Sequence, residues 1–153
     1  MAKKILIDSR SEPALFTLTG ISCHLRDYHL TYLLNEKLEL DFVKEEDFLG
    51  FPFFCCRDEN GFNIYYLIGN RGAETFLVPE MKLADYLLLI EGPLKKSQEE
   101  RLHKNIRSIE KILMVFEVNI EVIKNFGTFL NDLEIHFMNI HKEIKPKYSS
   151  SKK

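Results

Sequence analysis

Two aromatic-rich runs, Phe51 to Arg57 and Phe62 to Gly69, most constrain what this chain can fold into. The segment between them is Asp58-Glu59-Asn60-Gly61, and an Asn-Gly pair tolerates the positive φ angles that tight turns between antiparallel strands require. Both runs are rich in the residue types that strands favour. The pattern therefore predicts a β-hairpin.

Shorter patterns predict the remaining strands and two helices. Phe16 and Leu18 alternate with threonines, which is typical of a strand with one buried face, and a helix is expected after Asp27, whose carboxylate can accept the free amides of a first turn. Ser97, with Glu100 three residues later, has the spacing of a capping box and predicts the start of a second helix. The expected strands, besides the hairpin, are 14–19, 75–78, 86–91 and 112–118, and the expected helices are 27–38 and 97–109.

The order of these elements indicates an α+β fold. Residues 85 to 118 follow the order strand, helix, strand, which resembles half of a split βαβ sandwich. We expect a mostly antiparallel sheet of five or six strands, in a ferredoxin-like-related sandwich, with the helices near 27–38 and 97–109 packed on one face. Residues 1–120 are expected to form this single domain.

A last helix is predicted over 121–145, because apolar residues from Val122 to Ile144 recur at spacings of three and four. Its apolar arc is too large to face water alone, so it should pack either on its own domain, supplementing the helix layer, or on a second copy of the chain. Pro146 ends the pattern, and residues 146–153 have the composition of a flexible basic tail.

Composition narrows the class of protein. The chain has 153 residues and a formal net charge of -2, so no general basic field attracts it to nucleic acid. Gly69-Asn70-Arg71-Gly72 matches a GxxG clamp, but strand-like residues flank it and indicate a turn. The apolar run after Met1 stops at Asp8, and no apolar stretch approaches the length of about 20 residues that a membrane span needs. We therefore expect a cytoplasmic protein without a membrane segment.

The cysteines and histidines do not form a recognisable centre. Cys23, Cys55 and Cys56 are an odd number of cysteines and are expected to be thiols, the adjacent pair pointing to opposite faces of a strand. Cys23 lies near His24, Asp27 and His29, which are the ingredients of thiol catalysis, but cap and loop roles are favoured. No ligand spacing typical of a metal site is present, so no metal and no cofactor are predicted.

The segment Val78-Pro79-Glu80-Met81-Lys82-Leu83-Ala84-Asp85-Tyr86 carries the most specific motif. It resembles the signature of the IPExxxVDY family, a small bacterial family, with Val78 for the family's Ile and Ala84 for its Val. The resemblance extends over about residues 14 to 120. It implies no activity and supplies no catalytic residue. Its further matches are Gly20-Ile21-Ser22, Asp27-Tyr28, Leu34-Asn35, Tyr66-Leu67-Ile68 with Asn70, and Phe116-Glu117.

Two functions remain open. The first is a non-catalytic binding or adaptor module for an unknown protein partner or small ligand, using a sheet edge, the loop with Pro79, Glu80, Asp85 and Tyr86, or the last helix, which would make a homodimer. The second is a small acid-base enzyme, hydrolase-like, in which Glu80 and Asp85 share a pocket and Tyr86 or His24 assists. The enzyme requires that these carboxylates meet in a cleft, whereas the binding module is favoured if both bind backbone amides.

Overall fold

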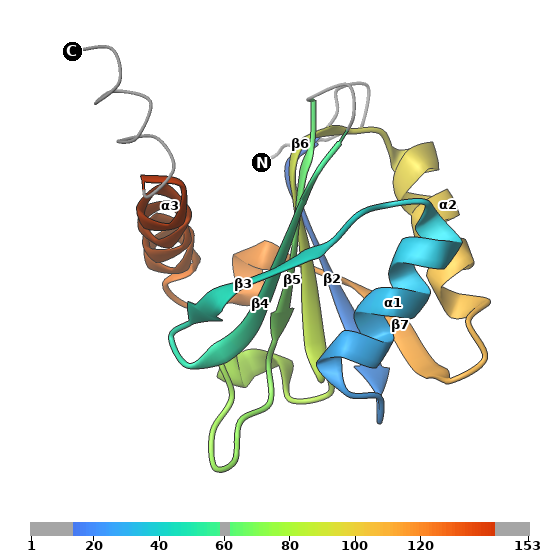
Figure 1. Ribbon diagram of the computed structural model, residues 1–153, viewed down its shortest axis with the longest axis horizontal. Helices are drawn as coiled ribbons and strands as arrows, with labels where there is room; N and C mark the ends of the chain where they lie inside the picture. Colours follow the sequence, from blue (N-terminus) through green and yellow to red (C-terminus); the bar gives the residue numbers. More distant parts are fainter. Residues whose placement is uncertain (1–13, 59–61, 143–153) are drawn as a thin grey trace.

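The computed structural model describes residues 14–58 and 62–142, which form one six-stranded sheet with helices on both faces (Figure 1). Neighbouring strands pair antiparallel throughout, in the order β3-β4-β5-β6-β2-β7. The α+β prediction is therefore confirmed. The strands are β2 (Ala14–Cys23), β3 (Val43–Phe48), β4 (Phe51–Arg57), β5 (Ile64–Gly69), β6 (Tyr86–Leu94) and β7 (Ile112–Val118).

Four of these strands, in the order β7-β2-β6-β5, have the arrangement of a ferredoxin-like sandwich. Strand β2 lies between β6 and β7, which α2 (Lys96–Arg107) connects, so this segment is a split βαβ unit. After α1 (Asp27–Leu38) the chain adds β3 and β4 at the far edge before it enters β5. The predicted hairpin is present as the β4–β5 pair, although its turn at 59–61 is outside the described residues.

The sheet is buried on both faces. Residues 87 to 90 are all fully buried, and they alternate between two apolar clusters: Leu88 and Ile90 face α1 and α2, whereas Leu87 and Leu89 face the opposite layer. This explains why residues 87 to 90 of β6 are continuously apolar. Cys55 and Cys56 likewise belong to opposite clusters, as expected for neighbours on a strand.

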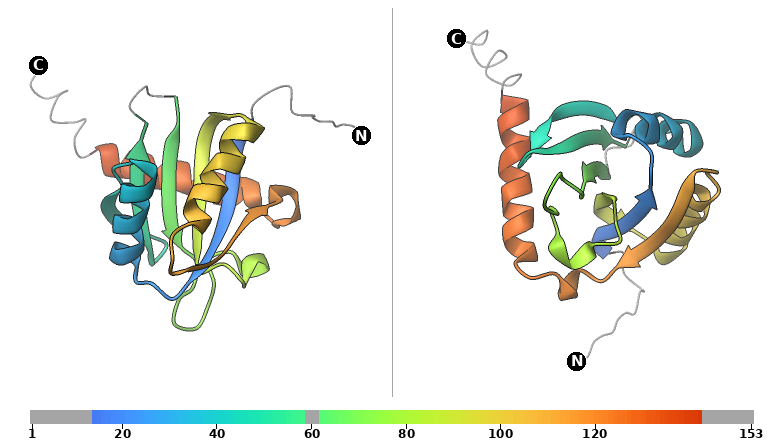
Figure 2. Two further views of the ribbon diagram at one scale, coloured as in Figure 1. Left: turned by 90° about the vertical axis from the view of Figure 1, so that its right-hand side faces the viewer. Right: turned by 90° about the horizontal axis from the view of Figure 1, so that it is seen from below.

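Helix α3 (Phe126–Lys142) provides that opposite layer, after a short 3-10 turn at Ile120–Val122 (Figure 2). Leu133 is buried, and Phe129 and Phe137 pack on the same sheet face. The expectation that this helix supplements the layer of α1 and α2 is wrong, because the odd-numbered apolar residues of β6 leave a second face to cover. The described part of α3 ends at Lys142, and the tail 146–153 is outside the described residues.

Two local predictions are also wrong, and one strand was missed. Residues 75–78 form no strand, only an isolated bridge between Arg71 and Phe76, because the chain there is drawn into a loop. Helix α2 begins at Lys96, and the Gln98 side chain accepts from the Lys95 amide at 2.8 Å, so Ser97 and Glu100 do not form the capping box. Strand β3 was not predicted, since Lys-Glu-Glu-Asp shows no apolar alternation, but such charges suit an edge strand that must not recruit another chain.

None of the helices in the described part of the chain is both long and apolar enough to cross a membrane.

Candidate functional site

The loop between β5 and β6 is organised around Asn70, which is fully buried. Its side-chain amide donates to the carbonyls of Met81 and Ala84 at 2.8 and 2.9 Å, and its Oδ1 accepts from the amide of Val78 at 2.7 Å. One side chain therefore bonds three backbone groups of the loop, and the Met81 carbonyl also accepts from the amide of Ala84 at 3.0 Å.

Pro79 and Glu80 occupy a 3-10 turn, Pro79–Met81, that starts directly after Val78. Pro79 takes the first position of the turn, where a missing amide costs no hydrogen bond. The carboxylate of Glu80 accepts from the backbone amide of Lys124 at 3.1 Å. Glu80 thus connects this loop to the segment that leads into α3.

Asp85 makes a different set of contacts. Its Oδ2 accepts from the backbone amide of Cys23 at 3.0 Å, and its Oδ1 accepts from Nε of Arg71 at 2.7 Å. Only 16% of the Asp85 side chain is exposed, whereas 55% of Arg71 is. Asp85 is a largely buried anchor for a largely exposed arginine.

Tyr86, the last residue of the motif, is held through its hydroxyl, which donates to the carbonyl of Leu25 at 2.6 Å. Burial raises the pKa of Tyr86, and the nearby Cys23, Asp27 and Asp85 raise it further. The phenol therefore stays protonated and acts as a hydrogen-bond donor rather than as a base.

The structure does not bring Glu80 and Asp85 together. Each carboxylate binds a backbone amide of a different segment, and Asp85 also has Arg71 as an ion partner. Asp85 and Tyr86 line a groove of about 570 Å³ at this end of the sheet, but Glu80 is not among the lining residues. The other groove residues are Ser22, Cys23, His24, Leu25, Pro52, Gly69, Arg71, Lys82 and Leu83.

Arg71 lies in this groove, and the sequence assigned it only to a turn. Asp85 fixes its Nε, and the guanidinium lies over the ring of Phe76, with 5.2 Å between Cζ and the ring centroid. These two contacts orient the planar guanidinium and leave its two terminal nitrogens without a hydrogen-bond partner among the described residues. The sequence gives little indication that Arg71 pairs with Asp85, because the whole loop separates the two residues.

The cysteines are poor nucleophiles. Burial raises the pKa of Cys23 and Cys56, and it raises the pKa of Cys55 to about 12. All three are free thiols. His24 is exposed, and Asp27 accepts from the Tyr28 amide in the first turn of α1, so the cluster around Cys23 has loop and helix-start roles.

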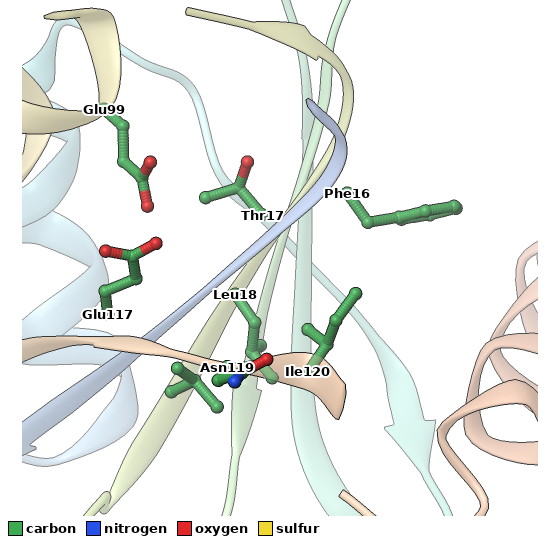
Figure 3. A pocket seen from close by; sticks show the side chains of 8 residues that line it. Phe16, Thr17, Leu18, Glu99, Glu117, Asn119 and Ile120 are labelled. Atoms are coloured by element: carbon green, nitrogen blue, oxygen red, sulfur yellow. The ribbon is translucent and has the colours of Figure 1, made fainter. Parts of the chain in front are cut away.

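A second pocket, of about 440 Å³, lies where α2 meets β2 and β7, and it was not predicted from the sequence. The carboxylates of Glu99 and Glu117 point toward each other there, beside Thr17 (Figure 3). Glu99 is only 2% exposed, and Lys96 pairs with Glu117 at 3.3 Å. The sequence carries one sign of this cluster. Glu99 and His103 are four residues apart, so both lie on the same face of α2, and that face is buried.

His103 continues this polar cluster toward the centre of the sheet. Its Nε2 lies 2.7 Å from the hydroxyl of Thr19, which is fully buried. Burial lowers the pKa of His103, although the nearby Glu99 opposes the shift. The cluster is a hydrogen-bonded contact between α2 and the sheet.

Within residues 14–58 and 62–142, no group of three or more His, Cys, Asp or Glu side chains is arranged to hold a metal ion. Comparisons of the chain with models of protein families, with curated proteins and with solved structures give no match.

Proposed function

We propose that this protein is a non-catalytic binding module whose groove at Arg71 takes an acidic segment of a partner protein. The observation that carries the proposal is the preorganised guanidinium. Asp85 holds Nε at 2.7 Å, Phe76 supports the plane of the group, and the terminal nitrogens have no hydrogen-bond partner among the described residues. An arginine fixed in this way loses little side-chain entropy when it binds a carboxylate in a bidentate manner.

The other groove residues fit the same ligand class. Lys82 and His24 are exposed beside Arg71, and among the described residues Asp85 is the one carboxylate that lines the groove. The fixed charges are thus two cations, Arg71 and Lys82, against one anion, Asp85. This is enough to attract a carboxylate, but far fewer cations than the binding of a phosphate backbone relies on.

Apolar contacts favour a peptide over a simple ion. Leu83 is 66% exposed at the groove, and Leu25 and Pro52 line it as well. A segment that alternates acidic and apolar side chains would place a carboxylate on Arg71 and cover Leu83.

The alternative, an acid-base enzyme that uses Glu80 and Asp85, has less support. Acid-base work by two carboxylates requires that they share a site, so that their pKa values are driven apart. Here each is bonded to a separate amide and one is ion-paired. Tyr86 also donates to a carbonyl and is not poised to act on a ligand.

The motif residues are consistent with membership of the IPExxxVDY family, which we also propose, and hence with a bacterial cytoplasmic protein. Pro79 starts a turn, Glu80 and Asp85 bind amides, and Tyr86 binds a carbonyl. In this proposal the motif is a rigid support that positions Arg71, and it performs no chemistry itself.

The test is a titration of the isotope-labelled full chain with two blocked peptides, acetyl-Glu-Leu-Glu-Leu-amide and its glutamine counterpart, followed by nuclear magnetic resonance. The acidic peptide is expected to shift the amides of residues 22–25, 71 and 82–86, and Arg71→Gln should abolish the shifts. Lys104→Gln removes an exposed charge on α2 and should leave them unchanged. Equal shifts with the glutamine peptide, or no shifts at all with either peptide, would reject the proposal.

A further inference from the structure

A separate cavity of about 270 Å³ lies between α3 and the face of the sheet opposite to α1 and α2. Strands β2, β5 and β6 contribute Phe16, Tyr66 and Glu91, and α3 contributes Leu133, Glu134 and Phe137. Figure 3 shows that Phe16 points to the side of β2 away from Thr17 and α2, which is the side of α3. The cavity does not involve the Arg71 groove.

Two aromatic residues that line this cavity, Tyr66 and Phe137, contact each other edge to face. The rings of Tyr66 and Phe137 have centroids 5.8 Å apart and an interplanar angle of 87°. Phe16, partly buried, is a third aromatic residue in the lining. Aromatic faces carry negative electrostatic potential, so rings set around a small volume attract a cation, above all one that is weakly hydrated.

The charged groups at the cavity are carboxylates, whose negative charge favours a cation. The Tyr66 hydroxyl donates to Oε1 of Glu91 at 2.9 Å, which fixes the carboxylate at the wall. Glu134 is exposed at the same cavity, and none of the described residues that line it is a lysine, arginine or histidine. Burial and the neighbouring Glu91 raise the pKa of Tyr66, so the phenol remains a donor and adds no competing charge.

One resident cation is close by. Cζ of Arg57 lies 5.8 Å from the centroid of the Phe137 ring, although Arg57 does not line the cavity. The ring therefore already supports a cation on the protein itself. A ligand cation would be repelled by Arg57, so removing that charge should strengthen binding.

We propose that this cavity binds a small quaternary ammonium compound, with its methyl groups against Tyr66, Phe137 and Leu133 and its charge balanced by Glu91. A quaternary nitrogen needs no hydrogen bond, so apolar walls cost it nothing and the rings contribute cation–π attraction. The cavity is near the small end of ligand sites, which suits a head group of this size and excludes a bulky ligand.

The experiment measures binding of choline to the full chain by calorimetry, with 3,3-dimethyl-1-butanol as the matched probe. That alcohol has the shape of choline but no charge. Choline is expected to bind with a dissociation constant in the millimolar range or tighter, and the alcohol at least about tenfold more weakly.

Three variants separate the charge from the packing, and Glu110→Gln is their control. Glu91→Gln should weaken choline binding about tenfold and leave the alcohol unaffected, and Phe137→Leu should weaken choline by a similar factor. Arg57→Met should strengthen it. Glu110→Gln, which removes an exposed carboxylate far from α3, should have no effect.

Thermal unfolding of each variant shows whether it is folded, and Glu91→Gln keeps the test decisive if Phe137→Leu is not. The proposal is overturned if choline does not bind up to about 10 mM, if the neutral alcohol binds equally well, or if Glu110→Gln weakens binding as much as Glu91→Gln does. None of these results depends on the Arg71 groove.

Discussion

The Phe116 ring on β7 lies directly over Gly20 on the neighbouring strand β2, so closely that a Cβ at residue 20 would be 2.5 Å from Cζ of the ring. The two residues are register partners in the sheet. The contact gives position 20 a physical requirement: the ring needs a partner without a side chain.

Gly20→Ala is expected to lower the free energy of unfolding by about 1 to 3 kcal/mol, because the added methyl group must displace the ring or the strand. Urea denaturation measures this change. The matched control is Gly127→Ala in α3, where nothing lies within 4 Å of the added Cβ and where alanine favours the helix. An equal loss of stability in both variants would mean that the close approach at Gly20 is not the cause.

Asn70→Ala is expected to cost roughly 3 kcal/mol, since it leaves the Val78 amide and the Ala84 carbonyl without this partner and removes one of the two donors to the Met81 carbonyl. Asn70→Asp keeps the shape but directs a carboxylate oxygen at two carbonyls, so it should be no better tolerated. Denaturation curves of both variants provide the measurement. Asn139→Ala on the exposed side of α3 should change stability by less than about 0.5 kcal/mol. A tolerated Asn70→Asp would show that the amide donors do not hold the loop.

Leu133→Ala is expected to destabilise the chain by about 2 to 4 kcal/mol, because Leu133 is buried against the protein's own sheet. The loss should be the same at all protein concentrations. Ile135→Ala, on the exposed side of the helix, is the control. If stability rises with protein concentration and light scattering gives twice the mass of the chain, α3 is instead held by a second copy, and the alternative of a helix-mediated dimer is correct.

His103 should make stability depend on pH. Its pKa is lowered in the folded state by burial, so the unfolded chain takes up the proton more readily. The stability contributed by neutral His103 is thus complete above the ordinary histidine pKa, about 6.5, and is lost as pH falls below it. Lys96 and Arg107 on α2 act in the same direction, whereas Glu99 and Glu117 oppose the shift.

His103→Gln should therefore show a smaller decrease in the free energy of unfolding between about pH 7 and pH 5 than the unaltered chain does. The slope is the quantity to compare, because the substitution can also alter stability at neutral pH. His24→Gln, at an exposed position, should keep the original slope. Identical slopes for all three proteins would remove His103 as the source.

Local patterns in the sequence predicted those elements that have a recognisable turn or a regular arrangement of apolar residues. The hairpin β4–β5, strand β2 and helix α1 have such patterns, and the structure contains them. Strand β3 has none, since its charged residues lie at an edge and only Phe48 is buried. Thr75 to Val78 has the composition of a strand, but Asn70 draws its end into a turn.

The grouping of side chains at the sites was beyond sequence reasoning. Asp85 binds the amide of a residue 62 positions earlier, and the Thr19 hydroxyl contacts a histidine 84 positions later. Such contacts follow from strand order, and the sequence has no clear signal for the position of β3 and β4 at one edge of the sheet. The motif Pro79 to Tyr86 was recognisable as a stiff loop, but the orientation of Arg71 depends on contacts with both Asp85 and Phe76.

The alternation of residues 87 to 90 between the two apolar clusters has a consequence for how this protein melts. Strand β6 packs against α1 and α2 on one side and against α3 on the other. Neither helix layer can therefore separate from the sheet without exposing one side of β6 to water. Heating should accordingly give a single calorimetric transition whose measured enthalpy equals the van't Hoff value, with α3 lost at the same temperature as α1 and α2.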